Sequence, residues 1–180
     1  METKLIFLIP FLAGMVSFSS CEKKNFDEMP PETQTGANTF GCLIDGQLFV
    51  GGCCAPWMTK VLSVTYNSAS DQLGISIWGK MNGGPAGSIS INIDSPKPNS
   101  IQKFSFANYF PSGLADCPNY SASNSGIYII TKLDTLNKIV SGRFEFVGRC
   151  ADWDFNIMDS TMNKEITQGR FDLKFDIYNE

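Results

Sequence analysis

The sequence predicts an all-β protein, an antiparallel meander of strands that forms a β-sandwich, with a small lipocalin-like barrel as the alternative. From Thr39 onward, apolar side chains recur at every second position, which is the period of a half-buried strand. No stretch after residue 21 has a helical period. Turn-forming residues separate about nine such stretches at near-regular spacing, as is typical of sandwiches and small barrels.

The first strands are the easiest to place. Residues 39–44 alternate and lead into Asp45-Gly46, a dipeptide typical of tight hairpin turns, and residues 48–50 return. Strands over residues 62–66 and 73–77 follow, separated by a polar turn. In residues 88–93, isoleucine alternates strictly with serine or asparagine, which predicts one buried and one solvent-facing side.

The second half adds a short strand near residues 104–106, a hairpin of residues 127–133 and 139–147, and a last strand over residues 171–177. The connections over residues 107–126 and 148–165 are longer than a meander needs. Long loops on a rigid β scaffold often carry binding surfaces. We therefore expect any ligand site in these two connections.

The amino-terminal 20 residues predict a signal peptide. A positive end at Lys4 precedes an apolar run over residues 5–16, which is too short to span a bilayer. Ser19 and Ser20 place small residues directly before Cys21, as lipoprotein cleavage requires. We predict lipidation of Cys21, a flexible tether over residues 21–38 and a single β domain over residues 39–180.

Composition excludes several function classes. The chain has no histidine, so it lacks the usual general base and every catalytic or metal site that depends on histidine. Its net charge is −4 and it has no basic run, which argues against a nucleic-acid partner. The sequence therefore predicts a protein that is not an enzyme and has no cofactor.

Six cysteines are present, and lipidation of one leaves an odd number, so we expect at most two disulfides and a leftover thiol. Cys42 and Cys150 share the parity of core residues, which makes them plausible neighbours. Cys117 lies in loop-like sequence, so a bridge to Cys53 or Cys54 would pin its loop to the first hairpin. No C-x-x-C spacing supports a metal cluster.

The acidic stretch near residue 152 could form a calcium site or a pair of hydrolytic carboxylates. Its D-x-D-x-N start matches a calcium loop, but Ile157 replaces the required glycine and Asn163 the required glutamate, so no metal is predicted. Asp152 and Asp154 would need a deep cleft to act as a hydrolytic pair. We expect solvated acids that could border a binding surface.

Aromatic residues supply the other candidates for binding. Exposed rings can stack on sugars or anchor a protein partner. The alternative is that these rings cover the open ends of the core. The candidates are Trp57, Trp78, Trp153, Tyr109 and Tyr120, with Phe110 beside them in the first long connection.

Four phrases carry a resemblance: TFGCLIDGQLF (39–49), IITKLD (129–134), IVSGRFEF (139–146) and ITQGRFDLK (166–174). In this order the chain resembles a group of small Bacteroidota lipoproteins of unknown function. The resemblance implies a bacterial cell envelope and one β domain, and it transfers no catalytic residues. The Cys53-Cys54 pair and residues 151–156 depart from the common pattern.

The sequence thus predicts a non-enzymatic outer-membrane lipoprotein, facing either the periplasm or the cell surface. It is expected to bind a glycan, a small ligand or a protein through its long connections. The competing interpretation is a structural or assembly component of the envelope. A carboxylate-based hydrolase is the third alternative.

Overall fold

The computed structural model describes residues 27–53, 61–113, 116–122 and 125–178. None of these residues forms a helix that could cross a membrane. The described chain is all-β, as predicted. Its strands are β1 (Thr39–Ile44), β2 (Gln47–Gly51), β3 (Leu62–Asn67), β4 (Gln72–Met81), β5 (Ala86–Asp94), β6 (Ile101–Lys103), β7 (Phe106–Pro111), β8 (Asn119–Ala122), β9 (Ile127–Asp134), β10 (Ile139–Ala151), β11 (Ile157–Lys174) and β12 (Asp176–Tyr178).

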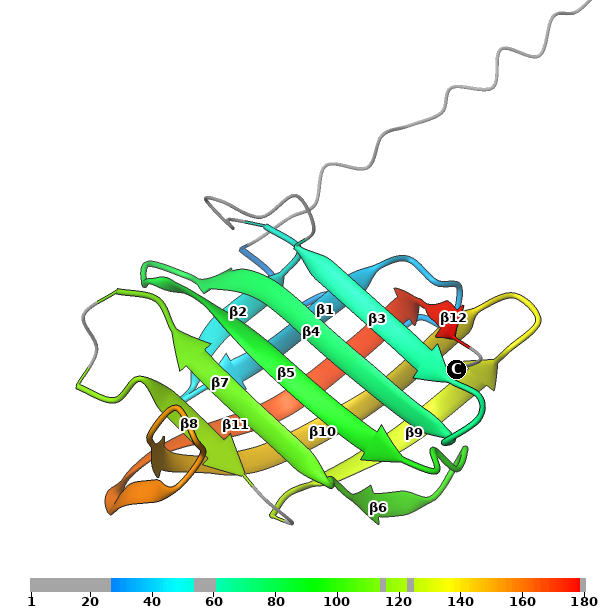
Figure 1. The fold of residues 1–180 in the computed structure, drawn as a ribbon. Coiled ribbons are helices and arrows are strands. Elements are labelled where there is room, and N and C mark those ends of the chain that lie inside the picture. Colours follow the sequence, from blue (N-terminus) through cyan, green and yellow to red (C-terminus); the bar gives the residue numbers. More distant parts are fainter. Residues whose placement is uncertain (1–26, 54–60, 114–115, 123–124, 179–180) are drawn as a thin grey trace, which may run out of the picture.

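The strands form two layers, with β3, β4, β5 and β7 in front of β1, β11, β10 and β9 (Figure 1). Pairing runs in the order β11-β1-β2-β4-β5-β7-β8-β10, and β10 also pairs with β11. The hydrogen bonds therefore close a circuit around the core. The fold combines the two layers of a sandwich with the continuous pairing of a barrel. Among the strands of the described residues, β12 and β3 are the one parallel pair.

Two long strands divide their pairing between the layers. Residues 72–77 of β4 pair with β3 and residues 79–81 pair with β2, while β10 pairs first with β9 and then with β8. Where each of these strands passes from one layer to the other, a glycine lets the neighbouring strand or ring come close to its backbone. A Cβ on Gly79 would lie 2.7 Å from the Phe49 ring, and one on Gly148 would lie 2.8 Å from the Tyr120 carbonyl oxygen.

The core lies between the layers and follows the predicted alternation. Ile89, Ile91 and Ile93 are fully buried, whereas Ser90 and Asn92 point outward. Aromatic rings fill the opposite layer, where the centroids of Phe40 and Phe144 are 5.1 Å apart.

The two long connections contain strands, which corrects the prediction that they are loops. Residues 107–126 contain most of β7 and all of β8, and residues 148–165 contain the end of β10 and the start of β11. The remaining β10–β11 turn is residues 152–156. Bulges opposite Arg149 and Cys150 shift the register of this hairpin, so its sequence lacks simple alternation even though the chain is paired.

The second half of the predicted tether is docked on the sheet. We call residues 29–38 the N-terminal strap. Its Thr33 hydroxyl and the backbone amides of Thr35, Gly36 and Ala37 donate hydrogen bonds to the buried carboxylate of Asp172. The prediction of a flexible tether is therefore wrong for the strap. Residues 1–26, with the predicted signal peptide and Cys21, lie outside the described residues.

The cysteine pairing differs from the expected one. Cys117 bonds to Cys150, with Cα atoms 5.7 Å apart, rather than to Cys53 or Cys54. Cys42 is a free buried thiol, so its candidacy for a disulfide was wrong, although the odd count had required a leftover thiol. Cys53 is disulfide-bonded, and Cys54 lies outside the described residues.

Candidate functional site

The outer face of the front layer carries a row of uncharged polar side chains. Outward-pointing residues alternate with the buried isoleucines of β4 and β5 and with Ala107 and Tyr109 of β7. The strand register places five of them side by side across β3, β4, β5, β7 and β8. This polar row is Ser63, Ser76, Ser90, Asn108 and Ser121.

Aromatic residues border the polar row on the same face. Trp78 pairs across the strands with Ser88, which in turn pairs with Phe110. Since adjacent strands lie about 4.8 Å apart, Trp78 and Phe110 are separated by roughly 10 Å. Phe106 borders the row on its other side, opposite Asn92.

The β10–β11 turn adds two further rings to this face. Trp153 stacks on Phe110 with centroids 6.2 Å apart and planes 13° apart. The Phe155 ring packs edge-on against Phe106, with ring centroids 4.8 Å apart, and against Phe110, with centroids 6.4 Å apart. Phe106, Phe110, Trp153 and Phe155 form what we call the aromatic patch. Trp153 is 72% exposed, and exposed apolar patches mark interaction sites. In Figure 1 the turn lies beside β8.

Asp152 shapes this turn. Its Oδ1 atom accepts hydrogen bonds from the backbone amides of Asp154 and Asn156, both at 2.9 Å. The hydrogen bonds from the Asn156 backbone and side chain lower the pKa of Asp152. Its carboxylate is thus engaged as a local cap, while Asp154 is exposed.

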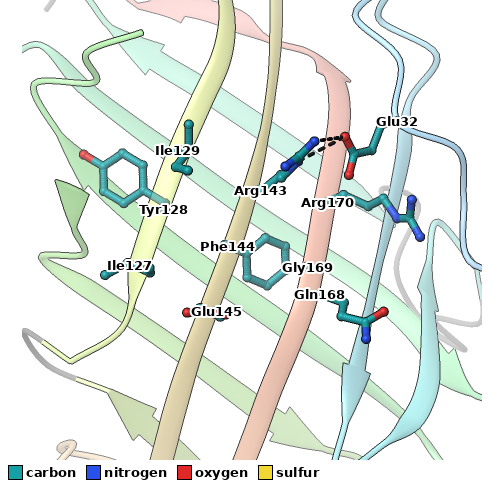
Figure 2. Close-up of a pocket in the computed structure, with 10 residues that line it drawn as sticks. All are labelled: Glu32, Ile127, Tyr128, Ile129, Arg143, Phe144, Glu145, Gln168, Gly169 and Arg170. Carbon is teal, nitrogen blue, oxygen red and sulfur yellow. Dashed lines mark hydrogen bonds and ion pairs between the residues drawn. The ribbon is translucent and has the colours of Figure 1, made fainter. Parts of the chain in front are cut away.

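A groove on the opposite layer is a second candidate (Figure 2). It has a volume of about 460 Å³ and lies on the outer face of β9, β10 and β11. Glu32 of the strap forms an ion pair with Arg143 across it, with Arg143 Nε donating at 3.0 Å. Gln168 enters the groove from a bulge where its φ is +51°. The lining residues are Glu32, Ile127, Tyr128, Ile129, Arg143, Phe144, Glu145, Gln168, Gly169 and Arg170.

The groove's charged groups balance one another. Two arginines stand against two glutamates, and Arg143 is already paired. No net charge therefore selects an ionic ligand. The sequence did not indicate this groove, because the strap that forms one side is distant in the chain from the strands beneath it.

The predicted binding residues separate into three groups. Trp78 and Trp153 lie on the candidate face, together with Asp152 and Asp154 in the turn. Tyr109 and Tyr120 do not, because both rings are buried and stacked in the core with centroids 6.2 Å apart. Trp57 lies outside the described residues.

Asn108 was not among the predicted candidates, because residues 107–126 were expected to form a loop. Phe106, Asn108 and Phe110 alternate with Ala107 and Tyr109, which is the signal that would have placed them on one side of a strand.

No cluster of three or more His, Cys, Asp or Glu residues that could hold a metal occurs in the described part of the chain. Comparison of the sequence with known protein families and with curated proteins, and of the fold with solved structures, finds no match. The case for a function therefore depends on the geometry of the two surfaces.

Proposed function

We propose that this protein is a non-enzymatic carbohydrate-binding protein of the bacterial cell envelope, anchored by lipid on Cys21. The observation that carries the proposal is the aromatic patch beside the polar row. The sequence features of a lipoprotein leader support the location.

The chemistry of this face suits a sugar. A pyranose ring presents weakly positive C–H groups on its faces and hydroxyl groups around its edge. The negative face of an aromatic ring attracts the former, and serine and asparagine side chains pair with the latter. The five residues of the polar row are uncharged, and the register continues from Ser121 to Arg149 of β10. The row itself offers hydroxyl and amide groups to a hydroxyl-rich ligand.

The spacing of the rings suits a chain rather than a single sugar. Trp78 and Phe110 are separated by one intervening strand at Ser88. The resulting distance of roughly 10 Å is about the length of two sugar residues in an extended glycan. A ligand that stacks on both rings would lie across Ser88.

The competing functions have less support. An assembly component would offer a long exposed strand edge, but the terminal strands β6 and β12 are only three residues long. A hydrolase would need Asp152 as an acid or base, yet its carboxylate caps the turn.

A glycan array tests the proposal with the soluble chain of residues 22–180. Wild type should bind at least one neutral glycan among β-1,4-glucan, β-1,3-glucan, chitin and mannan oligosaccharides. Trp153→Ala and Phe110→Ala should each weaken binding roughly tenfold, as loss of one stacking ring does. Isothermal titration calorimetry gives the affinities.

Leu136→Ala is the matched control, because Leu136 is 89% exposed in the β9–β10 turn and outside the face. Equal affinity in all four proteins, or a blank array, contradicts the proposal. A blank array combined with capture of an envelope protein would instead indicate a protein partner.

The anchor has a separate test. Labelled palmitate should appear on the wild-type chain and vanish in Cys21→Ala, because the thiol of Cys21 is the expected attachment point. Label that persists in the variant would contradict lipidation at this residue.

A further inference from the structure

Two side chains in the polar row are buried without hydrogen-bond partners. Asn108 is 1% exposed and Ser121 is 3% exposed, and they face each other in the strand register. The Asn108 Oδ1 and Ser121 Oγ atoms have no partner. Buried polar groups are nearly always paired, since leaving one unpaired is destabilising.

Side chains on the outer face, rather than the core, surround these atoms: the aromatic patch lies beside Asn108, and Arg149 of β10 lies opposite Ser121. Both side chains point outward, because their neighbours Ala107, Tyr109 and Tyr120 point into the core. Phe106 and Phe110 flank Asn108 on the outer side of β7, and the Phe155 ring contacts both of them. The Phe155 ring therefore bridges the two rings that flank Asn108.

The turn that carries Phe155 is strained and is shaped mainly by its own hydrogen bonds. Phe155 has φ +63°, a conformation that a bulky side chain rarely adopts. The hydrogen bonds that shape the turn run between Asp152, Phe155 and Asn156 within it. Asn119, beneath the turn, donates to the Asp152 carbonyl oxygen at 3.5 Å, and its own Oδ1 atom is also unpaired.

We propose that residues 152–156 are a lid over a sugar-binding subsite formed by Asn108 and Ser121. A sugar ring displaces Phe155, lies between Phe106 and Phe110, and pairs its hydroxyl groups with Asn108 Oδ1 and Ser121 Oγ. With the lid closed, Asn108 Oδ1 and Ser121 Oγ are unpaired and the backbone of Phe155 is strained. Both raise the free energy of the closed conformation, so a ligand that opens the lid has less to overcome. This inference rests on the proposed carbohydrate-binding function.

The first test separates a ligand role from a structural one. In the double variant Asn108→Leu/Ser121→Ala, the buried unpaired atoms are replaced by apolar groups. The ligand-free variant should melt at the same temperature as wild type or higher. Its affinity for cellotetraose, laminaritetraose, chitotetraose or mannotetraose, whichever wild type binds, should fall at least roughly tenfold. Ser121→Ala alone serves if the double variant does not fold.

The second test addresses the lid. Phe155→Gly removes the covering ring and places at position 155 the residue that tolerates positive φ. Its affinity for the same tetrasaccharide should rise roughly threefold or more. Without the Phe155 ring, a smaller fraction of the molecules has the lid closed, so less binding energy is used to open it. Leu136→Ala is again the control.

Each contrary result has one meaning. Wild-type affinity in the Asn108 and Ser121 variants overturns the subsite but leaves carbohydrate binding in place. A lower melting temperature overturns it too, because these atoms would then already be paired in the free protein. Unchanged or weaker binding by Phe155→Gly overturns the lid. If wild type binds none of the four tetrasaccharides and no glycan on the array, the proposed function fails together with the subsite.

Discussion

Asp172 shows how one residue organises a distant part of the chain. Its carboxylate is 1% exposed and accepts hydrogen bonds from Thr33, Ser141 and the strap amides. Burial by itself would raise the pKa of Asp172, but the hydrogen bonds from Thr33, Ala37, Ser141 and Gly36 outweigh it and hold the pKa well below its usual range.

The lowered pKa makes stability depend on acid. A carboxyl whose pKa is lower in the folded than in the unfolded state stabilises the fold fully above the unfolded pKa. That stabilisation is lost as the pH falls below about 4 toward the folded pKa. We expect the free energy of unfolding, measured with urea at several pH values, to decrease across this range. In Asp172→Asn this decrease should be smaller and stability at pH 7 lower by about 2–3 kcal/mol. Asp116→Asn, at an exposed position, is the control, and an identical pH profile in both variants would contradict the assignment.

At the scale of elements, the strap behaves as part of the domain rather than as a linker. Pro30 and Gly36 are buried, and Lys132 Nζ donates to the Gln34 carbonyl oxygen at 3.0 Å. The ion pair of Glu32 with Arg143 is exposed on both sides, and such pairs contribute little. The strap is therefore held mainly through Asp172.

Truncation tests this conclusion. A chain that begins at Thr39, the predicted domain start, lacks the strap donors to Asp172 and opens this carboxylate to solvent, with Ser141 as its remaining side-chain donor. It should be less stable than a chain that begins at Asp27 by about 3 kcal/mol, measured as the difference in free energy of urea unfolding. Equal stability of the two chains would show that the strap is dispensable.

At the scale of the whole molecule, the Cys117–Cys150 disulfide joins the start of β8 to the end of β10. Its partners are 33 residues apart, and both lie next to the strands that carry the aromatic patch. The bond therefore fixes the point from which the β10–β11 turn departs.

Removing this cross-link should destabilise the entire fold. A closed loop of this length corresponds to about 3–4 kcal/mol in the chain-entropy account of disulfides. Cys117→Ala/Cys150→Ala should lose that amount in urea unfolding. Cys42→Ala is the control, because it removes a buried but unpaired thiol and so measures the stability lost through packing alone. A similar decrease in the free energy of unfolding in both variants would show that packing, and not the cross-link, accounts for it.

The sequence by itself determined the fold class and most strands. Alternation of apolar and polar residues directly reflects which side of a strand is buried, so it identified the isoleucines of β5 and the inward face of β4. It also placed Trp78 and Trp153 among the binding candidates. The same local pattern placed Tyr109 and Tyr120 in a loop, because neighbouring turn residues obscured two short strands.

Tertiary structure alone decided the strap, the disulfide pairing and the candidate site. Each depends on residues far apart in the sequence: Thr33 with Asp172, Cys117 with Cys150, and Phe155 with Phe106. Burial and hydrogen bonding between such residues arise only when strands are brought into register, and local periodicity carries no information about that register. For this reason the sequence predicts which residues point outward, whereas the folded chain determines which of them meet.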